Sequence, residues 1–156
     1  MLIYIIGEIM NLIDKVKFGK FLKSLSISKI DTLSGVEFEV FIADFFSYLG
    51  YKTRLTASSG DNGIDIIATK KRYSIGIQTK LYYNHNVSNK AIQEVFSGKN
   101  YYKTTFALAI SNWNFSTPAK NLASQLGVGI VDRGILTTML SNSRKANVIL
   151  IKSLLN

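Results

Sequence analysis

Residues 63–81 read GIDIIATKKRYSIGIQTKL, in which two apolar runs flank a short basic turn. This pattern is typical of a β-hairpin whose strands lie in the core of a domain. With the turn centred on its basic residues, Asp65 lies directly opposite Gln78, and opposed residues have Cβ atoms roughly 5 Å apart. Strand alternation puts Gln78 and Lys80 on one face. Because one residue of slippage would turn Asp65 to the other face, this arrangement depends on the register.

The segment before the hairpin predicts a helix at residues 36–49. Ser34 and Glu37 have the spacing of a capping box, in which each side chain accepts a hydrogen bond from the other residue's backbone amide. Glu37 therefore has a structural role, and it shares the polar side of the helix with Asp44. Glu39 instead lies among the apolar positions, where a carboxylate needs a partner. We expect that partner to be the polar site on the hairpin.

The rest of the chain alternates strands and helices. Ser88 is expected to cap one helix, and Pro118 takes the favoured proline position at the start of another. Alternation of this kind implies parallel strands with right-handed crossovers, and therefore an α/β fold. The apolar tail, residues 147–155, fits either a strand or a helix. The expected strands lie at residues 51–56, 63–68, 73–81, 106–110 and 128–131, and the helices at 89–99, 117–127 and from 133 onward.

The first residues, 1–13, are apolar but contain Gly7 and Glu8. This stretch is too short to span a bilayer and lacks the features of a signal peptide, so we expect no stable membrane insertion. Residues 14–23 mix apolar and lysine positions, which predicts an amphipathic helix. It packs on the domain or on a second protomer, and attachment to a membrane surface is the weaker alternative.

The composition of the 156 residues restricts the chemistry of the chain. Without cysteine it has no disulfide, thiol catalysis or zinc–thiolate site, which suits a reducing cytoplasm. His85 is the single histidine, which argues against a histidine-built metal centre. The formal net charge is +9, from 19 Lys and Arg against 10 Asp and Glu. This balance favours a polyanionic partner such as DNA, although an AT-rich genome that over-uses lysine would produce it too.

The polar residues of the hairpin and helix match the needs of phosphodiester hydrolysis, which are a hydrated divalent cation, a positioned water and positive charge. Asp65 offers the hard oxygen ligand that Mg²⁺ prefers, and Gln78 offers an amide oxygen. Lys80 orients or deprotonates the water and stabilises the developing anion. Glu39 supplies a second negative charge. Each residue alone has a plainer interpretation, as a turn residue, a surface lysine or a solvated amide.

Four segments in order resemble the catalytic domain of Mrr-type restriction endonucleases. That family is the branch of the PD-(D/E)xK nuclease superfamily in which glutamine replaces the second acid. The resemblance covers residues 33–136, about two-thirds of the chain. The segments are Gly35-Val36-Glu37-Phe38-Glu39, Gly50-Tyr51, the run from Ser59 to Ile67, and Gln78-Thr79-Lys80.

The resemblance implies a restriction-endonuclease-like core, with a mixed central sheet of αβββαβ topology and flanking helices. It also implies Mg²⁺-dependent DNA cleavage, with Mn²⁺ as a substitute. The implied catalytic residues are Glu39, Asp65, Gln78 and Lys80, and all of these except Lys80 are implied metal ligands. At the position of Thr79 the family commonly has cysteine, a departure that we expect to be tolerated because this side chain faces away from the site.

We divide the chain into an N-terminal helical extension, residues 1–32, and a nuclease domain, residues 33–156. Neither flank of the resemblance contains a recognisable DNA-reading module. We therefore expect a metal-dependent DNA endonuclease without a separate sequence- or methyl-recognition domain. Recognition of DNA structure or targeting by a partner protein would then direct cleavage.

Residues on the loops around the hairpin are candidates for DNA contact. The loop before Asp65 contributes Ser59 and Asn62, for which a plain turn role is the alternative. The segment after Lys80 contributes Tyr82, His85 and Lys90, for which packing or a solvated loop is the alternative.

Three other functions remain open. A Holliday-junction or branched-DNA resolvase would also be small, basic and, as a homodimer, two-fold symmetric. A non-catalytic DNA-binding module on the nuclease fold is less favoured, because drift would readily have lost one of the four site residues. An assembly subunit that docks through its apolar N-terminus is the third alternative.

Overall fold

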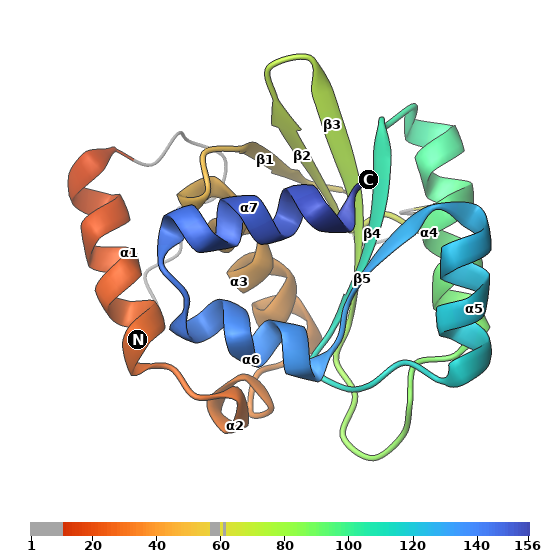
Figure 1. The fold of residues 1–156 in the computed structure, drawn as a ribbon, viewed down its shortest axis with the longest axis horizontal. Helices are drawn as coiled ribbons and strands as arrows, with labels where there is room; N and C mark the ends of the chain where they lie inside the picture. Colours follow the sequence, from red (N-terminus) through yellow and green to blue (C-terminus); the bar gives the residue numbers. More distant parts are fainter. Residues whose placement is uncertain (1–10, 57–59, 61) are drawn as a thin grey trace.

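The structure, a computed structural model, describes residues 11–56, 60 and 62–156. Its centre is a five-stranded sheet in the order β1-β2-β3-β4-β5, in which β1, β2 and β3 are antiparallel and β3, β4 and β5 are parallel (Figure 1). This confirms the mixed sheet and the αβββαβ core. The strands are β1 Lys52–Leu55, β2 Ile66–Lys70, β3 Tyr73–Lys80, β4 Phe106–Ser111 and β5 Val128–Val131.

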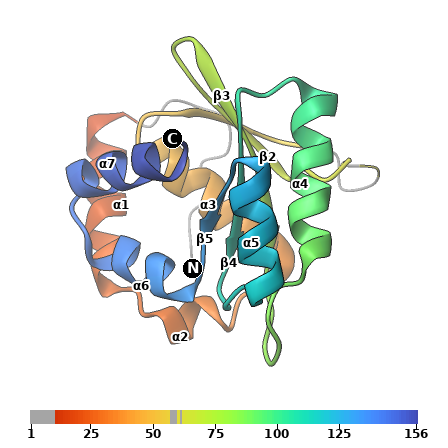
Figure 2. The ribbon, with the colours of Figure 1, turned by 45° about the vertical axis from the view of Figure 1, so that its right-hand side comes forward.

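Helices cover both faces of the sheet (Figure 2). One face packs on α3 (Gly35–Tyr48), α6 (Arg133–Ser141) and α7 (Arg144–Leu154), with α1 (Leu12–Ser24) and α2 (Ile27–Ile30) outside them. The other face packs on α4 (Asn89–Tyr102) and α5 (Thr117–Leu126). Two apolar clusters result, one on each side of the sheet. The apolar tail, whose sequence fitted either a strand or a helix, forms most of the helix α7.

The β2–β3 hairpin has the predicted register. Ile66 pairs with Ile77 and Lys70 with Tyr73, so the two-residue turn is basic and has Lys71 at φ 52°. Continued by one residue, this register places Asp65 opposite Gln78. The strand begins later than the predicted residue 63, because the backbone before Ile66 turns against α4.

Helix α3 begins with the predicted capping box. Ser34 Oγ accepts a hydrogen bond from the Glu37 amide at 3.2 Å, and Glu37 Oε2 accepts one from the Ser34 amide at 2.7 Å. The expectation that Asp44 lies on a polar side is wrong, since this residue is only 2% exposed. Beyond its first turns α3 is enclosed by the sheet and by other helices, and an enclosed helix has no solvent side.

The remaining boundaries differ little from expectation. Ser88 is the N-cap residue of α4, as predicted, but its side chain makes no capping hydrogen bond. Helix α5 begins at Thr117 with Pro118 in its first turn, as predicted; Ser116 caps it, and Gly127 ends it at φ 66°. Near the N-terminus, α1 packs on the domain through Phe18 and Leu22. Packing on the domain is one of the two alternatives predicted for this helix. Within the described residues, no helix is long and apolar enough to cross a membrane.

Candidate active site

The Asp65 carboxylate is buried at the start of β2 and accepts three hydrogen bonds on Oδ2. Gln78 Nε2 donates at 3.0 Å, the Thr79 amide at 2.7 Å and Thr79 Oγ1 at 3.0 Å. Asp65 is 6% exposed and Gln78 is 5% exposed. Three donors on one oxygen favour the ionised carboxylate and fix its orientation. The hairpin thus brings Asp65 and Gln78 together.

The expectation that the Thr79 side chain faces away from the site is wrong, because its hydroxyl contacts Asp65. The reason lies at the end of the β2–β3 ladder. The Asp65 amide donates to the Ile77 carbonyl at 2.8 Å, whereas the ladder register would pair Asp65 with Gln78. The carboxylate therefore lies beside the Thr79 backbone, within reach of two consecutive side chains.

The amide oxygen of Gln78 is the open acceptor of this site. While Nε2 donates to Asp65, Oε1 is buried and accepts no hydrogen bond among the described residues. A buried oxygen without a donor is costly, and a hard cation is one group that would satisfy it. No group of three or more acidic or histidine side chains that could hold a metal occurs within the described ranges. The Gln78 amide oxygen and the Asp65 carboxylate are therefore two oxygen donors of this site that could hold a metal.

Lys80 ends β3 and forms an ion pair with a residue that the sequence analysis missed. Its Nζ lies 3.0 Å from Glu94 Oε2, and Lys90 Nζ lies 3.8 Å from Glu94 Oε1. Lys80 and Glu94 side chains are 27% and 31% exposed, so the pair is partly shielded from water. Glu94 lies on α4, and its spacing to Lys90 was the only signal in the sequence. That spacing does not reveal that this face of α4 meets the end of β3.

Two glycines allow the loop before Asp65 to contact α4. Gly63 has φ 84°, and a Cβ there would collide with the Glu94 carbonyl. A Cβ on Gly98 would lie 2.7 Å from the Asn62 carbonyl. The loop and the helix therefore touch through their backbones, which fixes Asp65 relative to Glu94.

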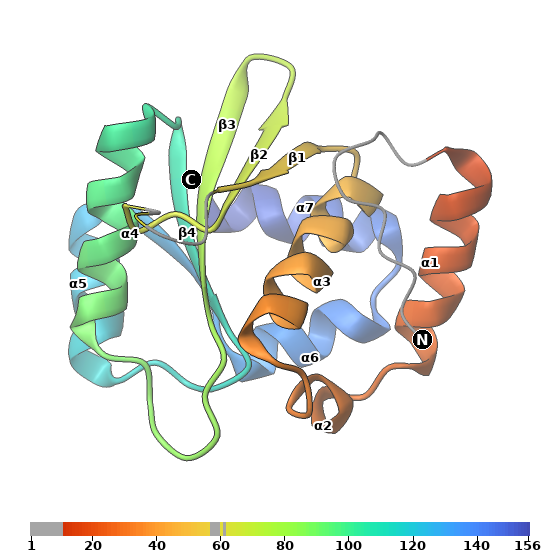
Figure 3. The same cartoon turned by 180° about the vertical axis from the view of Figure 1, so that it is seen from behind.

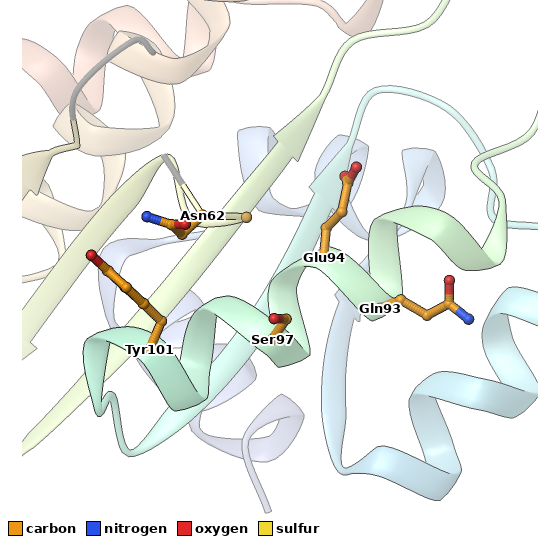
Figure 4. A pocket seen from close by; sticks show the side chains of 6 residues that line it. Asn62, Gln93, Glu94, Ser97 and Tyr101 are labelled. Atoms are coloured by element: carbon orange, nitrogen blue, oxygen red, sulfur yellow. The ribbon is translucent and has the colours of Figure 1, made fainter. Parts of the chain in front are cut away.

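A pocket of about 440 Å³ lies between this loop and α4. Figure 4 shows Glu94, Ser97 and Tyr101 along one side of the helix, with Asn62 on the facing loop. The pocket is therefore next to the Lys80–Glu94 ion pair. Its lining residues are Asn62, Gly63, Gln93, Glu94, Ser97 and Tyr101.

Glu39 lies in the second turn of α3 and is half-buried. The last turn of α3 leads through Gly50 to Lys52, which pairs with Thr69 near the hairpin turn. The N-terminal turns of α3 therefore lie toward the other end of the sheet, where β3 ends (Figure 3). Glu39 thus lies toward the end of the domain where β3 ends, and its role in the site stays a prediction.

The architecture matches a known family. A family model for the Mrr catalytic domain (Mrr_cat), described as restriction endonuclease, matches residues 30–140. The chain belongs to the Mrr catalytic-domain family of restriction endonucleases. This confirms the resemblance found in the sequence and places the Mrr domain among nucleases that act on DNA. The comparison with curated proteins gives no match.

Three solved structures resemble the Mrr domain. The DNA modification-dependent restriction endonuclease AspBHI has a TM-score of 0.59 at 16% identity, over 94% of this chain and 41% of AspBHI. The MspJI restriction endonuclease, in complex with a 27-mer oligonucleotide, has a TM-score of 0.52 at 15% identity, over 96% of this chain and 39% of MspJI. AF1548, a protein of unknown function, has a TM-score of 0.51 at 17% identity, over 74% of this chain and 76% of AF1548. These likenesses show the fold alone, and the chain spans about two-fifths of AspBHI and MspJI.

The residues proposed to contact DNA lie in two places on the Mrr domain. The rings of Tyr82 and His85 pack against each other in the loop after β3, tilted by 43° with centroids 4.1 Å apart. Lys90 is exposed beside Glu94, and Asn62 is exposed at φ 51° with Nδ2 donating to the Gly60 carbonyl. Ser59 lies outside the described residues. The structure thus brings Asn62 and Lys90 to the α4 side and leaves Tyr82 and His85 on a separate loop.

A partly buried network that the sequence analysis also missed fixes the loop after Lys80. Asn112, fully buried at the end of β4, accepts from the Tyr82 amide and donates to the Tyr82 carbonyl, both at 2.8 Å. Asn112 also donates to Asp31, which accepts two hydrogen bonds at 2.9 Å from Arg133. The Arg133 guanidinium beside Asp31 holds the pKa of that carboxyl below its usual range. These hydrogen bonds join α2, β4 and α6 beneath this loop.

Proposed function

We propose that this protein is a metal-dependent DNA endonuclease that hydrolyses phosphodiester bonds. The observation that carries the proposal is the Asp65–Gln78 pair, in which a fixed carboxylate lies beside a buried amide oxygen that has no donor among the described residues. Family membership supports cleavage of DNA. The chemistry of this donor set supports the metal.

Asp65 and Gln78 Oε1 would hold the cation, with Glu39 as the second acid. A bound divalent ion polarises the phosphate and lowers the pKa of the attacking water. Mg²⁺ suits these oxygen donors, and Mn²⁺ accepts the same ligands. Since Gln78 carries no charge, we expect modest affinity for the metal.

Lys80 would bind the phosphate at the reacting position and stabilise its developing charge. The ion pair with Glu94 restrains the flexible lysine side chain before DNA arrives. This restraint reduces the entropy that must be lost to place the ammonium group. Glu94 is therefore proposed as a positioning residue that acts through Lys80.

We further propose that the described elements form one nuclease core without a reading module of their own. Among the described residues, α1, α6 and α7 contribute to the same apolar cluster as α3 and the sheet. This packing supports one nuclease core with no second reading module among these elements. Selectivity would then come from DNA structure or from a partner.

Cleavage assays test the proposal directly. Purified protein is incubated with supercoiled, linear, methylated and branched DNA in Mg²⁺, Mn²⁺ or EDTA, beside Asp65→Ala and Lys80→Ala. We expect cleavage that requires the metal and is lost in both variants. Cleavage that survives both substitutions would contradict the assigned site, and DNA binding without any cleavage would favour a non-catalytic module.

A further inference from the structure

Five cations gather around the C-terminus of α3, at the end of the domain away from the candidate active site. They come from α1, the β2–β3 hairpin and α7, and the charges of the other four act on the ammonium group of Lys70. We call this surface the basic patch. Its members are Lys15, Lys70, Lys71, Arg144 and Lys152.

Two members of the basic patch are held in place by α3. Lys70 Nζ donates to the Leu49 carbonyl at 3.1 Å, and Arg144 Nε donates to the Tyr48 carbonyl at 2.6 Å. Both lie against Gly50, where a Cβ would be 3.2 Å from Arg144 Nη2 and 3.6 Å from Lys70 Nζ. Carbonyls at a helix C-terminus favour such cations, which explains why like charges come so close.

These carbonyls do not neutralise the basic patch. None of its five members takes part in an ion pair within the part of the chain that the structure describes. Burial, followed by the charges of Arg144, Lys152, Lys71 and Lys15, lowers the pKa of Lys70. Lys71 and Lys152 are exposed, so the excess positive charge faces solvent. An anion bound here would relieve the repulsion among the five.

The basic patch is too far from the candidate active site to contact the same phosphate. Lys70 pairs with Tyr73 at the start of β3, whereas Lys80 ends that strand. At about 3.3 Å per residue, the strand separates the two positions by roughly 23 Å. B-DNA rises about 3.4 Å per base pair, so this separation corresponds to roughly seven base pairs. The hairpin also projects from the body of the domain (Figures 1 and 3).

We propose that the basic patch binds the phosphate backbone of DNA roughly seven or more base pairs from the bond that is cleaved. Arg144 uses Nε for the Tyr48 carbonyl and keeps its Nη donors for a phosphate, while Lys71 and Lys152 add mobile charge. The position of the cleaved bond in this proposal rests on the proposed function. It defines the substrate as DNA that extends to the hairpin end, as flanking duplex or as a second arm.

The test is DNA binding in EDTA, where no cleavage occurs. Affinity is measured for duplexes of about 8 to about 30 base pairs over a range of salt concentrations. The variant Lys71→Gln/Lys152→Gln is compared with Lys20→Gln/Lys23→Gln, which removes the same charge from exposed positions of α1. Lys152→Gln alone is the second variant if the double variant unfolds.

We expect wild type and the α1 control to gain affinity with duplex length, while the patch variant loses most of that gain. Its binding to the longest duplex should be roughly tenfold weaker, with a salt slope smaller by roughly 2. Equal length dependence and slope in wild type and patch variant would overturn the proposal, as would an equal loss in the control. Since these assays need no cleavage, an inactive wild type would contradict the proposed function and leave this result intact.

Discussion

The Gln78 side chain decides how strongly the candidate site attracts a metal. Gln78→Glu places a second carboxylate beside Asp65, where the present Nε2–Oδ2 distance is 3.0 Å. Repulsion between the two carboxylates should lower the melting temperature in EDTA. With the metal the same pair becomes a better ligand set, so we expect roughly tenfold tighter Mg²⁺ binding, about 1.4 kcal/mol.

Thermal unfolding in EDTA and in graded Mg²⁺ measures this effect without any cleavage. Gln78→Ala, which removes the amide oxygen, is the matched control and should show a smaller Mg²⁺-induced rise than wild type. If wild type, Gln78→Ala and Gln78→Glu all gain the same melting temperature from Mg²⁺, Gln78 is not a metal ligand.

Glu94 should affect cleavage through Lys80. Glu94→Gln keeps the size of the side chain and removes its charge, so the Lys80 ammonium loses its partner at 3.0 Å. For a partly exposed pair worth about 1 kcal/mol, we expect a roughly fivefold slower single-turnover rate with DNA affinity unchanged or tighter. Lys90→Ala, which removes the weaker 3.8 Å pairing, is expected to weaken binding and leave the rate alone.

Because Lys80→Ala is expected to lose cleavage, a double-mutant cycle in the free energy of unfolding, measured in EDTA, separates this role from metal binding. If Glu94 acts through Lys80, Glu94→Gln has no further effect on that free energy in the Lys80→Ala background. An undiminished effect there, together with a shift in the metal requirement for cleavage by Glu94→Gln, would instead make Glu94 a ligand.

Single residues also show where sequence reasoning stops. The register that joins Asp65 to Gln78 and the capping box of Ser34 and Glu37 follow from local rules, and both are confirmed. The orientation of Thr79 depended on an irregular ladder end, and the partner of Lys80 on the packing of a distant helix. The spacing of residues in the sequence indicates neither the orientation of Thr79 nor the partner of Lys80.

At the scale of elements, the contact between the loop before Asp65 and α4 should be intolerant of side chains. Gly63→Ala adds a Cβ that meets the Glu94 backbone, at a position with φ 84°. Gly60→Ala has similar backbone strain at φ 72°, but among the described residues no atom lies within 4 Å of the new Cβ. We expect Gly60→Ala to cost about 1 kcal/mol and Gly63→Ala clearly more, with loss of cleavage.

Chemical denaturation of the two variants measures the difference. Equal free energies of unfolding for Gly60→Ala and Gly63→Ala would show that the loop moves away from α4 at little cost. The close contact would then not be what positions Asp65.

The Asp31–Arg133 pair should stabilise the protein in a pH-dependent way. The pKa of Asp31 is lowered in the folded state, chiefly by the Arg133 hydrogen bonds. Its contribution is therefore complete above the unfolded pKa of about 3.9, and is lost as pH falls through the lower folded pKa. At neutral pH we expect Asp31→Asn to lose about 1 kcal/mol after allowance for solvent screening, or roughly 2–4 °C in melting temperature.

Melting temperatures of wild type and Asp31→Asn from pH 7 to pH 3 check this prediction. The difference should stay constant down to about pH 5 and shrink below about pH 4. Asp14→Asn, which removes a carboxylate from α1, is the control for the loss of one negative charge. A difference that stays constant to pH 3 would contradict the assigned ion pair.

Elements were predicted better than their contacts. Alternating apolar runs indicated all five strands and most helices, because side-chain periodicity reflects which face is buried. The same periodicity placed Asp44 on a solvent face, since it carries no information about helices that arrive later in the chain. The network of Asn112, Asp31 and Arg133 joins segments up to 102 residues apart, and no local pattern indicates it.

At the scale of the whole molecule, the division into an extension and a nuclease domain can be tested through α1. Leu22 is 2% exposed and belongs to the same apolar cluster as α3, α6 and the sheet, whereas Leu12 on the same helix is 78% exposed. If α1 is part of the nuclease core, Leu22→Ala costs roughly 2–5 kcal/mol and Leu12→Ala almost nothing. The protein should then unfold in one transition, with the melting temperature of Leu22→Ala lower by roughly 5–15 °C. A separable extension would instead melt alone, leaving the main transition of Leu22→Ala where wild type has it, and calorimetry distinguishes the two outcomes.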